Sequence, residues 1–174
     1  MAYIFQISIK PKTEGERGLP KLRVEKVVVT FAGLEGDYNT FRTMKKGATP
    51  DMALLIMPVS TLDELNKEGW PVKPGDIGEN LTLYGASYPE LRSGKKYKAG
   101  DVIFEITTSA TPCKNLALLS YVGEEKITEF MRTLVNRRGW YAKILQEGTL
   151  EQGMTLEELT ERKDEWPILH SPFL

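Results

Sequence analysis

Short runs of β-branched and aromatic residues, separated by turns rich in glycine and proline, constrain the fold of this chain most strongly. The segments 2–9 (AYIFQISI), 22–30 (LRVEKVVVT) and 101–108 (DVIFEITT) each have the residue content of a strand. Helical signals are fewer, and strands do not alternate regularly with helices, which disfavours a Rossmann-type domain. We therefore expect a mainly β (α+β) fold with a barrel-like β core and two or three peripheral helices.

Two segments carry the helical signals. In 60–69 (STLDELNKEG), Ser60 or Thr61 is expected to cap the helix and Gly69 to end it. In 123–137, apolar residues recur at steps of three and four, which is typical of a helix with one buried face.

Size and charge limit the classes of partner. With 174 residues, 41% of them hydrophobic, the chain is long enough for one domain with a substantial core. The net charge is −1 and no basic stripe occurs, so a nucleic-acid partner is not expected. The longest apolar runs are too short to span a bilayer, and the first residues read as a strand rather than a leader. A single cysteine fits a reducing compartment, so we expect a cytoplasmic protein without a membrane partner.

That single cysteine, Cys113, follows a strand-like run in the stretch SATPCKNL (109–116). One interpretation is an inert sulfur in the core, and the other is a reactive thiolate. A pair with the single histidine, His170, requires the C-terminal tail to fold across the site. One cysteine and one histidine do not suffice for a protein-only zinc centre. A lone thiolate is still able to bind a metal whose other ligands belong to an organic cofactor.

Two polar glycine-rich loops, 34–37 (LEGD) and 74–80 (PGDIGEN), are candidates for anion contacts. Neither loop matches a nucleotide-binding pattern, and ordinary turn chemistry is the alternative. Six basic residues are candidates for holding phosphate, with plain surface charge as the alternative: Arg42, Lys45, Lys46, Arg137, Arg138 and Lys143.

An ordered set of motifs resembles the MOSC domain, the family named after the C-terminal domain of molybdenum-cofactor sulfurases. The motifs are GLEGD (33–37), PGDIGENL (74–81), GD (100–101), PC followed by L (112–116) and RGWYAKIL (138–145) with two later glycines. They cover about 20–160 and indicate a small stand-alone member, 1–174 being one domain with a tail over 161–174. The chain departs from the family at Asn39, where a histidine is frequent, and in the stretch FRTMKKGATPD that follows.

The resemblance implies a molybdenum cofactor (molybdopterin) bound at a pocket edge, with Cys113 as the catalytic residue and the metal ligand. Arg42, Arg138 and Lys143 would hold the phosphate of the cofactor, and Gly78, Glu79 and Asn80 would shape the pocket wall. Gly36, Asp37 and Pro112 would support this arrangement. Relatives reduce N-hydroxylated small molecules with electrons from an external donor, and pyridoxal phosphate binding is a further property that the resemblance suggests.

Two other functions stay open. The family has also been viewed as persulfide carriers, in which Cys113 would accept sulfur from a cysteine desulfurase for building metal–sulfur centres. The third hypothesis is a non-catalytic binding or accessory domain, which predicts a sealed Cys113. The sequence leaves the substrate, the electron donor and the oligomeric state open.

Overall fold

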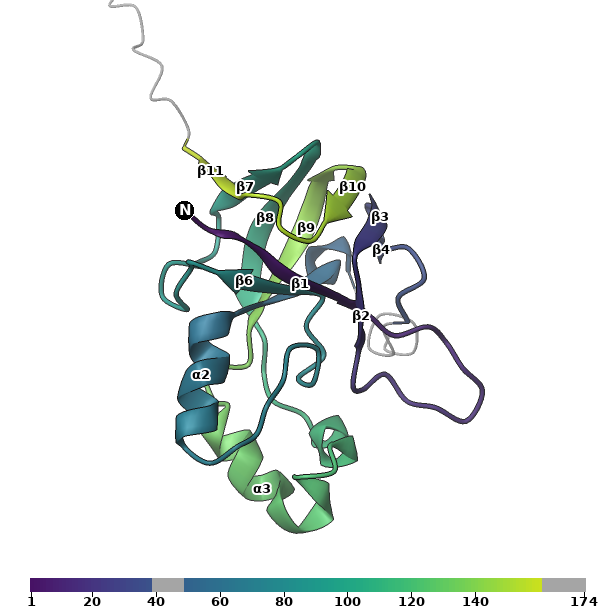
Figure 1. The fold of residues 1–174 in the computed structure, drawn as a ribbon, viewed down its shortest axis with the longest axis vertical. Helices are drawn as coiled ribbons and strands as arrows, with labels where there is room; N and C mark the ends of the chain where they lie inside the picture. Colours follow the sequence, from purple (N-terminus) through teal and green to yellow (C-terminus); the bar gives the residue numbers. More distant parts are fainter. Residues whose placement is uncertain (39–48, 161–174) are drawn as a thin grey trace, which may run out of the picture.

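The computed structural model of this chain describes residues 1–38 and 49–160. Two β-sheets form one end of the molecule and two α-helices the other (Figure 1). The larger sheet has eight strands in the order β11-β7-β8-β9-β5-β6-β1-β2, and the smaller has three in the order β10-β3-β4. All strand pairs are antiparallel except β5 with β6.

The bounds of the elements follow the chain in order. The first sheet strands are β1 (Tyr3–Ile9), β2 (Leu22–Val24), β3 (Lys26–Thr30), β4 (Gly33–Leu34) and β5 (Leu54–Pro58). The later strands are β6 (Leu81–Tyr84), β7 (Lys96–Ala99), β8 (Val102–Ser109), β9 (Trp140–Gln146), β10 (Gly148–Glu151) and β11 (Glu157–Leu159). The helices are α2 (Val59–Lys67) and α3 (Gly123–Thr133), with short 3-10 turns η1 (Pro50–Met52) and η2 (Lys114–Leu118).

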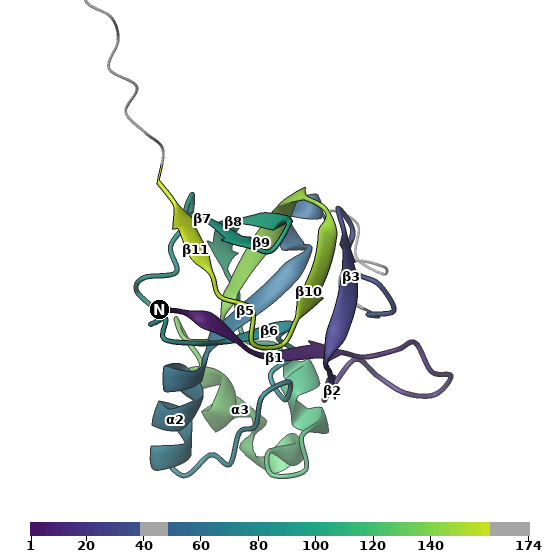
Figure 2. The same ribbon diagram turned by 45° about the horizontal axis from the view of Figure 1, so that its top comes forward.

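The eight-stranded sheet curls so that its two ends approach each other (Figure 2). The chain between β10 and β11 hydrogen-bonds to the start of β1: Ile4 N–H donates to Met154 O at 2.9 Å, and Leu156 N–H donates to Ala2 O at 2.8 Å. These bonds connect the β11 end of the sheet to the β1 side without forming a closed barrel. The expected barrel-like β core with two α-helices is therefore confirmed.

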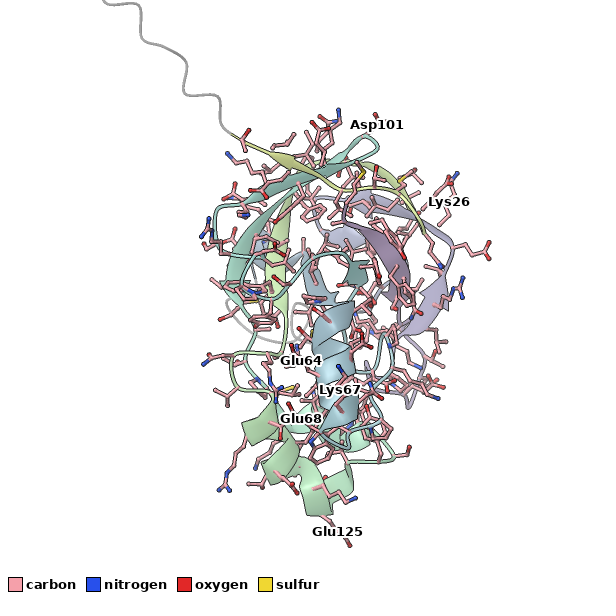
Figure 3. All side chains as sticks on the ribbon, turned by 60° about the vertical axis from the view of Figure 1, so that its left-hand side comes forward. Lys26, Glu64, Lys67, Glu68, Asp101 and Glu125 are labelled. Carbon is pink, nitrogen blue, oxygen red and sulfur yellow. The ribbon has the colours of Figure 1, made fainter. Side chains whose placement is uncertain are left out.

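Two apolar cores divide the interior. The first lies within the curved sheets and contains fully buried residues such as Ile4, Leu54 and Phe104. The second lies between the sheets and the helices and joins α2, α3, η2 and the 74–80 loop through Leu65, Phe130, Leu116 and Ile77. Figure 3 shows the charged side chains of Glu64 and Lys67 on α2, of Glu68 at its end and of Glu125 on α3, far from Asp101 at the sheet end.

Three local predictions from the sequence were wrong. Helix α2 begins one residue after Pro58 and has no side-chain cap, because the Ser60 hydroxyl instead donates to Ala86 O at 3.4 Å. Helix α3 ends at Thr133, four residues early, and Asn136 follows with φ +60. The expected strand 22–30 is two strands that belong to different sheets, separated at Glu25.

Within the described ranges, no helix is both long enough and apolar enough to cross a membrane. Arg42, Asn39 and His170 lie outside the described residues, as do Lys45 and Lys46.

Candidate functional site

Cys113 lies just beyond the end of β8, where the strand leaves its partner β9. The ladder between these strands reaches Ser109 opposite Trp140, and Ala110 N–H then donates to Gly139 O at 2.8 Å. Cys113 itself has an extended backbone and directly precedes η2. Its thiol forms no disulfide, and the residue as a whole is partly exposed instead of buried in the core.

The segment after Cys113 is anchored by apolar packing. Leu116 is fully buried in the second core together with Ile77, which lies in the middle of the 74–80 loop. Tyr121 adds a polar link, because its hydroxyl donates to Asp76 Oδ2 at 2.9 Å. The structure thus holds the turn that begins at Cys113 against the glycine-rich loop.

Arg138 stands one residue before Gly139, at the same end of the β8–β9 ladder as Cys113. The residue is 7% exposed, and its Nε and Nη1 atoms are buried without a hydrogen-bond partner. Its Nη2 atom lies 3.8 Å from the position that a Cβ would take at Gly78. A guanidinium stays charged at neutral pH, so leaving it buried and unpaired costs several kcal/mol.

Glu79 follows Gly78 and is fully buried. Its Oε1 accepts from Gly75 N–H at 2.7 Å and from the Thr82 hydroxyl at 3.3 Å, whereas Oε2 has no partner. Burial raises the pKa of this carboxyl, and the hydrogen bonds from Gly75 and Thr82 only partly oppose the shift. Glu79 therefore braces the loop from inside.

Asn80 and Asp37 form a buried polar network that joins the two glycine-rich loops. The Asn80 amide accepts from Leu55 N–H at 3.1 Å and donates to Asp37 Oδ2 at 2.9 Å. Asp37 also accepts from Lys21 Nζ at 2.6 Å and from Lys10 N–H at 2.8 Å. These two side chains bind backbone N–H groups, Lys21 and each other, so their observed contacts are structural.

The other candidates lie in different surroundings. Lys143 projects from β9 and pairs with Glu105 on β8, with 3.3 Å between Nζ and Oε1. Arg137 donates two hydrogen bonds to the carboxylate of Glu68, the residue directly after α2, at 2.6 and 2.8 Å. Gly36 adopts φ +77 in the turn before Asp37, and Pro112 is partly exposed beside Cys113.

Tyr88 is a neighbour of Arg138 that the sequence did not reveal. Its hydroxyl donates to Gly139 O at 3.1 Å, and its carbonyl accepts from Trp140 Nε1 at 3.2 Å. Burial raises the pKa of Tyr88, and the positive charge of Arg138 opposes this shift in part. Tyr88 is separated from Gly139 by 51 positions, so no local pattern predicts the contact.

Within residues 1–38 and 49–160, no group of three or more His, Cys, Asp or Glu side chains is arranged to hold a metal ion. An open hollow on the sheet end is lined by β1, β2, β3 and β10 and includes Tyr3, Phe5, Arg23 and Lys26. This hollow shares no residue with the surroundings of Cys113 and Arg138.

A protein-family model, a curated relative and solved structures all match most of this chain. The MOSC domain model matches residues 43–157. The uncharacterised protein YflK of Bacillus subtilis is 25% identical over 149 residues, which cover 83% of this chain and 64% of YflK, so the chain spans less than two thirds of that relative.

Solved structures share the fold. YiiM from Geobacillus stearothermophilus superposes with a TM-score of 0.69 at 26% identity, covering 92% of this chain and 76% of that one. The YUAD protein from Bacillus subtilis has a TM-score of 0.73 at 17% identity, covering 89% and 93%. Because the domain model spans more than half of the sequence and these structures share its architecture, the chain belongs to the MOSC domain family.

Proposed function

We propose that this protein binds a molybdenum cofactor with the Cys113 thiolate as the protein ligand to the metal. The observation that carries the proposal is a partly exposed, disulfide-free Cys113 beyond the same strand end as Arg138, whose buried Nε and Nη1 have no hydrogen-bond partner. Soft thiolate ligands suit such metals, and the family is associated with this cofactor.

The residues present fit the cofactor in two respects. Cys113 would supply a soft sulfur ligand to the metal, and its thiol is free of a disulfide. The anionic part of the cofactor needs a fixed positive charge, and Arg138 offers a guanidinium with orphaned N–H groups. The 74–80 loop, with Gly78, Glu79 and Asn80, would form the wall between them.

When bound, the cofactor would supply two-electron redox chemistry, for which N-hydroxylated small molecules are the proposed substrates and an external protein the electron donor. The residues of this chain would bind and orient the cofactor. Cys113 would hold the metal, and Arg138 would hold the anionic end. Arg42 and Lys143 stay candidates for further contacts, although Lys143 would first have to leave Glu105. Pyridoxal phosphate binding stays a prediction without a contact assigned to it.

The direct test is the molybdenum and pterin content of protein made in a host that synthesises the cofactor. We expect wild-type protein to carry both, Cys113→Ser to lose most of the molybdenum, and the exposed neighbour variant Thr111→Ser to retain it. Well-folded wild-type protein without molybdenum, or equal content in Cys113→Ser, would contradict the proposal.

A persulfide carrier is the second candidate, and the accessibility of Cys113 favours it as well. This function predicts that exposure to a cysteine desulfurase and its substrate adds one sulfur to Cys113, and that a reductant removes it. Mass spectrometry of the intact chain measures the adduct, and its absence with an active desulfurase rules the carrier out. The third hypothesis, an accessory domain with a sealed cysteine, is not favoured by a partly exposed thiol.

A further inference from the structure

Glu79 is a titratable side chain that lies wholly inside the protein, between the 74–80 loop and β6. Its Oε1 accepts hydrogen bonds from Gly75 N–H and from the Thr82 hydroxyl, whereas Oε2 has no partner. A buried carboxylate needs hydrogen bonds at both oxygens or a cation beside it. The ionised form of Glu79 is therefore costly in the closed loop, and the protonated form is favoured.

The acidic and neutral groups around Glu79 do not offset this cost. Asp76, on the same loop, carries charge of the same sign and raises the pKa of Glu79 further. Tyr121, from the segment after η2, gives its hydroxyl proton to Asp76. From the sheet, β1 faces the loop with the Ser8 hydroxyl and β6 with the Thr82 hydroxyl, and both are neutral.

Two cations lie along the same loop, and neither compensates Glu79. Lys21, whose backbone N–H donates to the loop, places its ammonium on the Asp37 carboxylate at 2.6 Å. Arg138 lies beside Gly78, with Nη2 3.8 Å from the position of a Cβ there. No positive charge is among the groups that shift the pKa of Glu79.

The loop that carries this carboxyl also holds the turn that begins at Cys113. Asp76 Oδ2 accepts from the Tyr121 hydroxyl at 2.9 Å, and Ile77 shares the second core with Leu116. Both loop contacts come from positions within three residues of the buried carboxyl. A loop movement that brings the carboxyl to water therefore breaks the contacts with the turn as well.

We infer that Glu79 is a pH-sensitive latch for the turn that begins at Cys113. While Glu79 keeps its proton, the 74–80 loop stays closed against that turn. Loss of the proton leaves a buried carboxylate with too few hydrogen bonds, and local opening of the loop relieves it by admitting water. The latch acts on the position of the turn, so it applies with either candidate function and is tested without a cofactor.

Amide hydrogen exchange of the full-length, cofactor-free protein measures this opening. The reporters are Gly75 N–H, which donates to Glu79, and Leu116 N–H, which donates to Cys113 O at 3.2 Å. The open loop loses the Glu79 proton at the ordinary pKa of 4.5, and the closed loop loses it only at the raised pKa. Protection of both amides should be highest below the ordinary value, fall by up to about tenfold for each pH unit above it, and level off above the raised pKa.

Two variants and one further amide serve as controls. Glu79→Gln has no proton to lose, so protection of the two reporters should match wild type in acid and stay constant as the pH rises. Glu125→Gln, at an exposed position on α3, should follow wild type. Ile106 N–H, which donates to Lys95 O at 2.8 Å in the large sheet, should be more protected than Leu116 N–H, because only global unfolding exposes it.

Three results would overturn the latch. The first is wild-type protection that stays constant with pH after correction for the intrinsic exchange rate. The second is a Glu79→Gln profile that follows wild type, and the third is equal protection of Leu116 and Ile106, which leaves global unfolding as the only opening. If Glu79→Gln does not fold, wild type decides: parallel pH profiles for Gly75 and Leu116 support the latch, and unrelated profiles refute it.

Discussion

At the scale of single residues, Asp37 joins the two loops of the candidate site. Its carboxylate accepts from Lys10 N–H, Lys21 Nζ and the Asn80 amide, and its side chain is fully buried. Asp37→Ala removes three bonds and the carboxylate that Lys21 faces, so we expect a loss of about 3 kcal/mol in the free energy of unfolding. Denaturant unfolding measures it, and exposed Asp63→Ala should change stability by about 0.5 kcal/mol or less. Equal effects of the two variants would contradict the buried network.

Glu79 gives the residue-scale prediction for pH. Burial raises its pKa from the ordinary value of 4.5, so above pH 4.5 the folded state keeps a proton that the unfolded state has lost. The contribution of Glu79 to stability is therefore fully present below that value and is lost as the pH rises through the raised pKa. Glu79→Gln mimics the protonated form, so we expect it to match wild type in acid and to exceed it at neutral pH. Unfolding curves across this range measure the difference, and a pH-independent difference would be the contrary result.

At the scale of elements, helix α3 packs into the second core through Phe130. Phe130 is fully buried and contacts the ring of Trp70, with 4.7 Å between centroids, and the edge of Tyr121 at 6.3 Å. Phe130→Ala should cost about 3–5 kcal/mol of unfolding free energy, whereas Val135→Ala, at a position 57% exposed, should cost about 0.5 kcal/mol or less. Thermal unfolding compares the two variants, and a small effect at Phe130 would show that α3 does not pack as described.

Gly139 lies directly before β9, where β9 begins to pair with β5, and it follows Arg138 in the chain. The residue adopts φ +111, and a Cβ there would lie 2.7 Å from Ile56 O. Gly153 has φ +89 with nothing within 4 Å of its Cβ position, so it is a matched control for backbone strain alone. We expect Gly139→Ala to destabilise the protein by about 1–3 kcal/mol more than Gly153→Ala does. Similar losses for both variants would refute the close contact.

The strands were predictable from the sequence because alternation is a local property. The run 101–108 has Val102, Phe104 and Ile106 on one face, and all three are fully buried in β8. The break at Glu25 was not predictable, because 22–24 pairs with β1 whereas 26–30 pairs with β10, far along the chain.

The candidate site likewise combines features that are visible locally in the sequence with contacts between distant positions that are not. Cys113 stands out as the single cysteine, and the glycine-rich loops stand out by composition. The roles of Asp37 and Asn80 depend on a contact across 43 positions, and Tyr88 reaches Gly139 across 51. Sequence spacing carries no information on such pairs. Arg137 and Arg138 are adjacent in sequence, yet Arg137 pairs with the Glu68 carboxylate, whereas Arg138 is buried with no hydrogen-bond partner at Nε or Nη1.

At the scale of the whole molecule, two apolar cores meet at the Cys113 turn. The sheet core fixes the end of β8 through its ladder with β9, and the helical core fixes η2 through Leu116. These two contacts fix the chain on either side of Cys113. We therefore expect Cys113 to add a sulfur ligand to a metal that is otherwise held by the cofactor.

X-ray absorption at the molybdenum edge tests this claim most directly, since it counts the sulfur atoms around the metal. Wild-type protein loaded with the cofactor should show one sulfur neighbour more than the residual molybdenum that Cys113→Ser retains, with Thr111→Ser matching wild type. An identical sulfur shell in wild type and Cys113→Ser would contradict the assignment of Cys113 as the metal ligand.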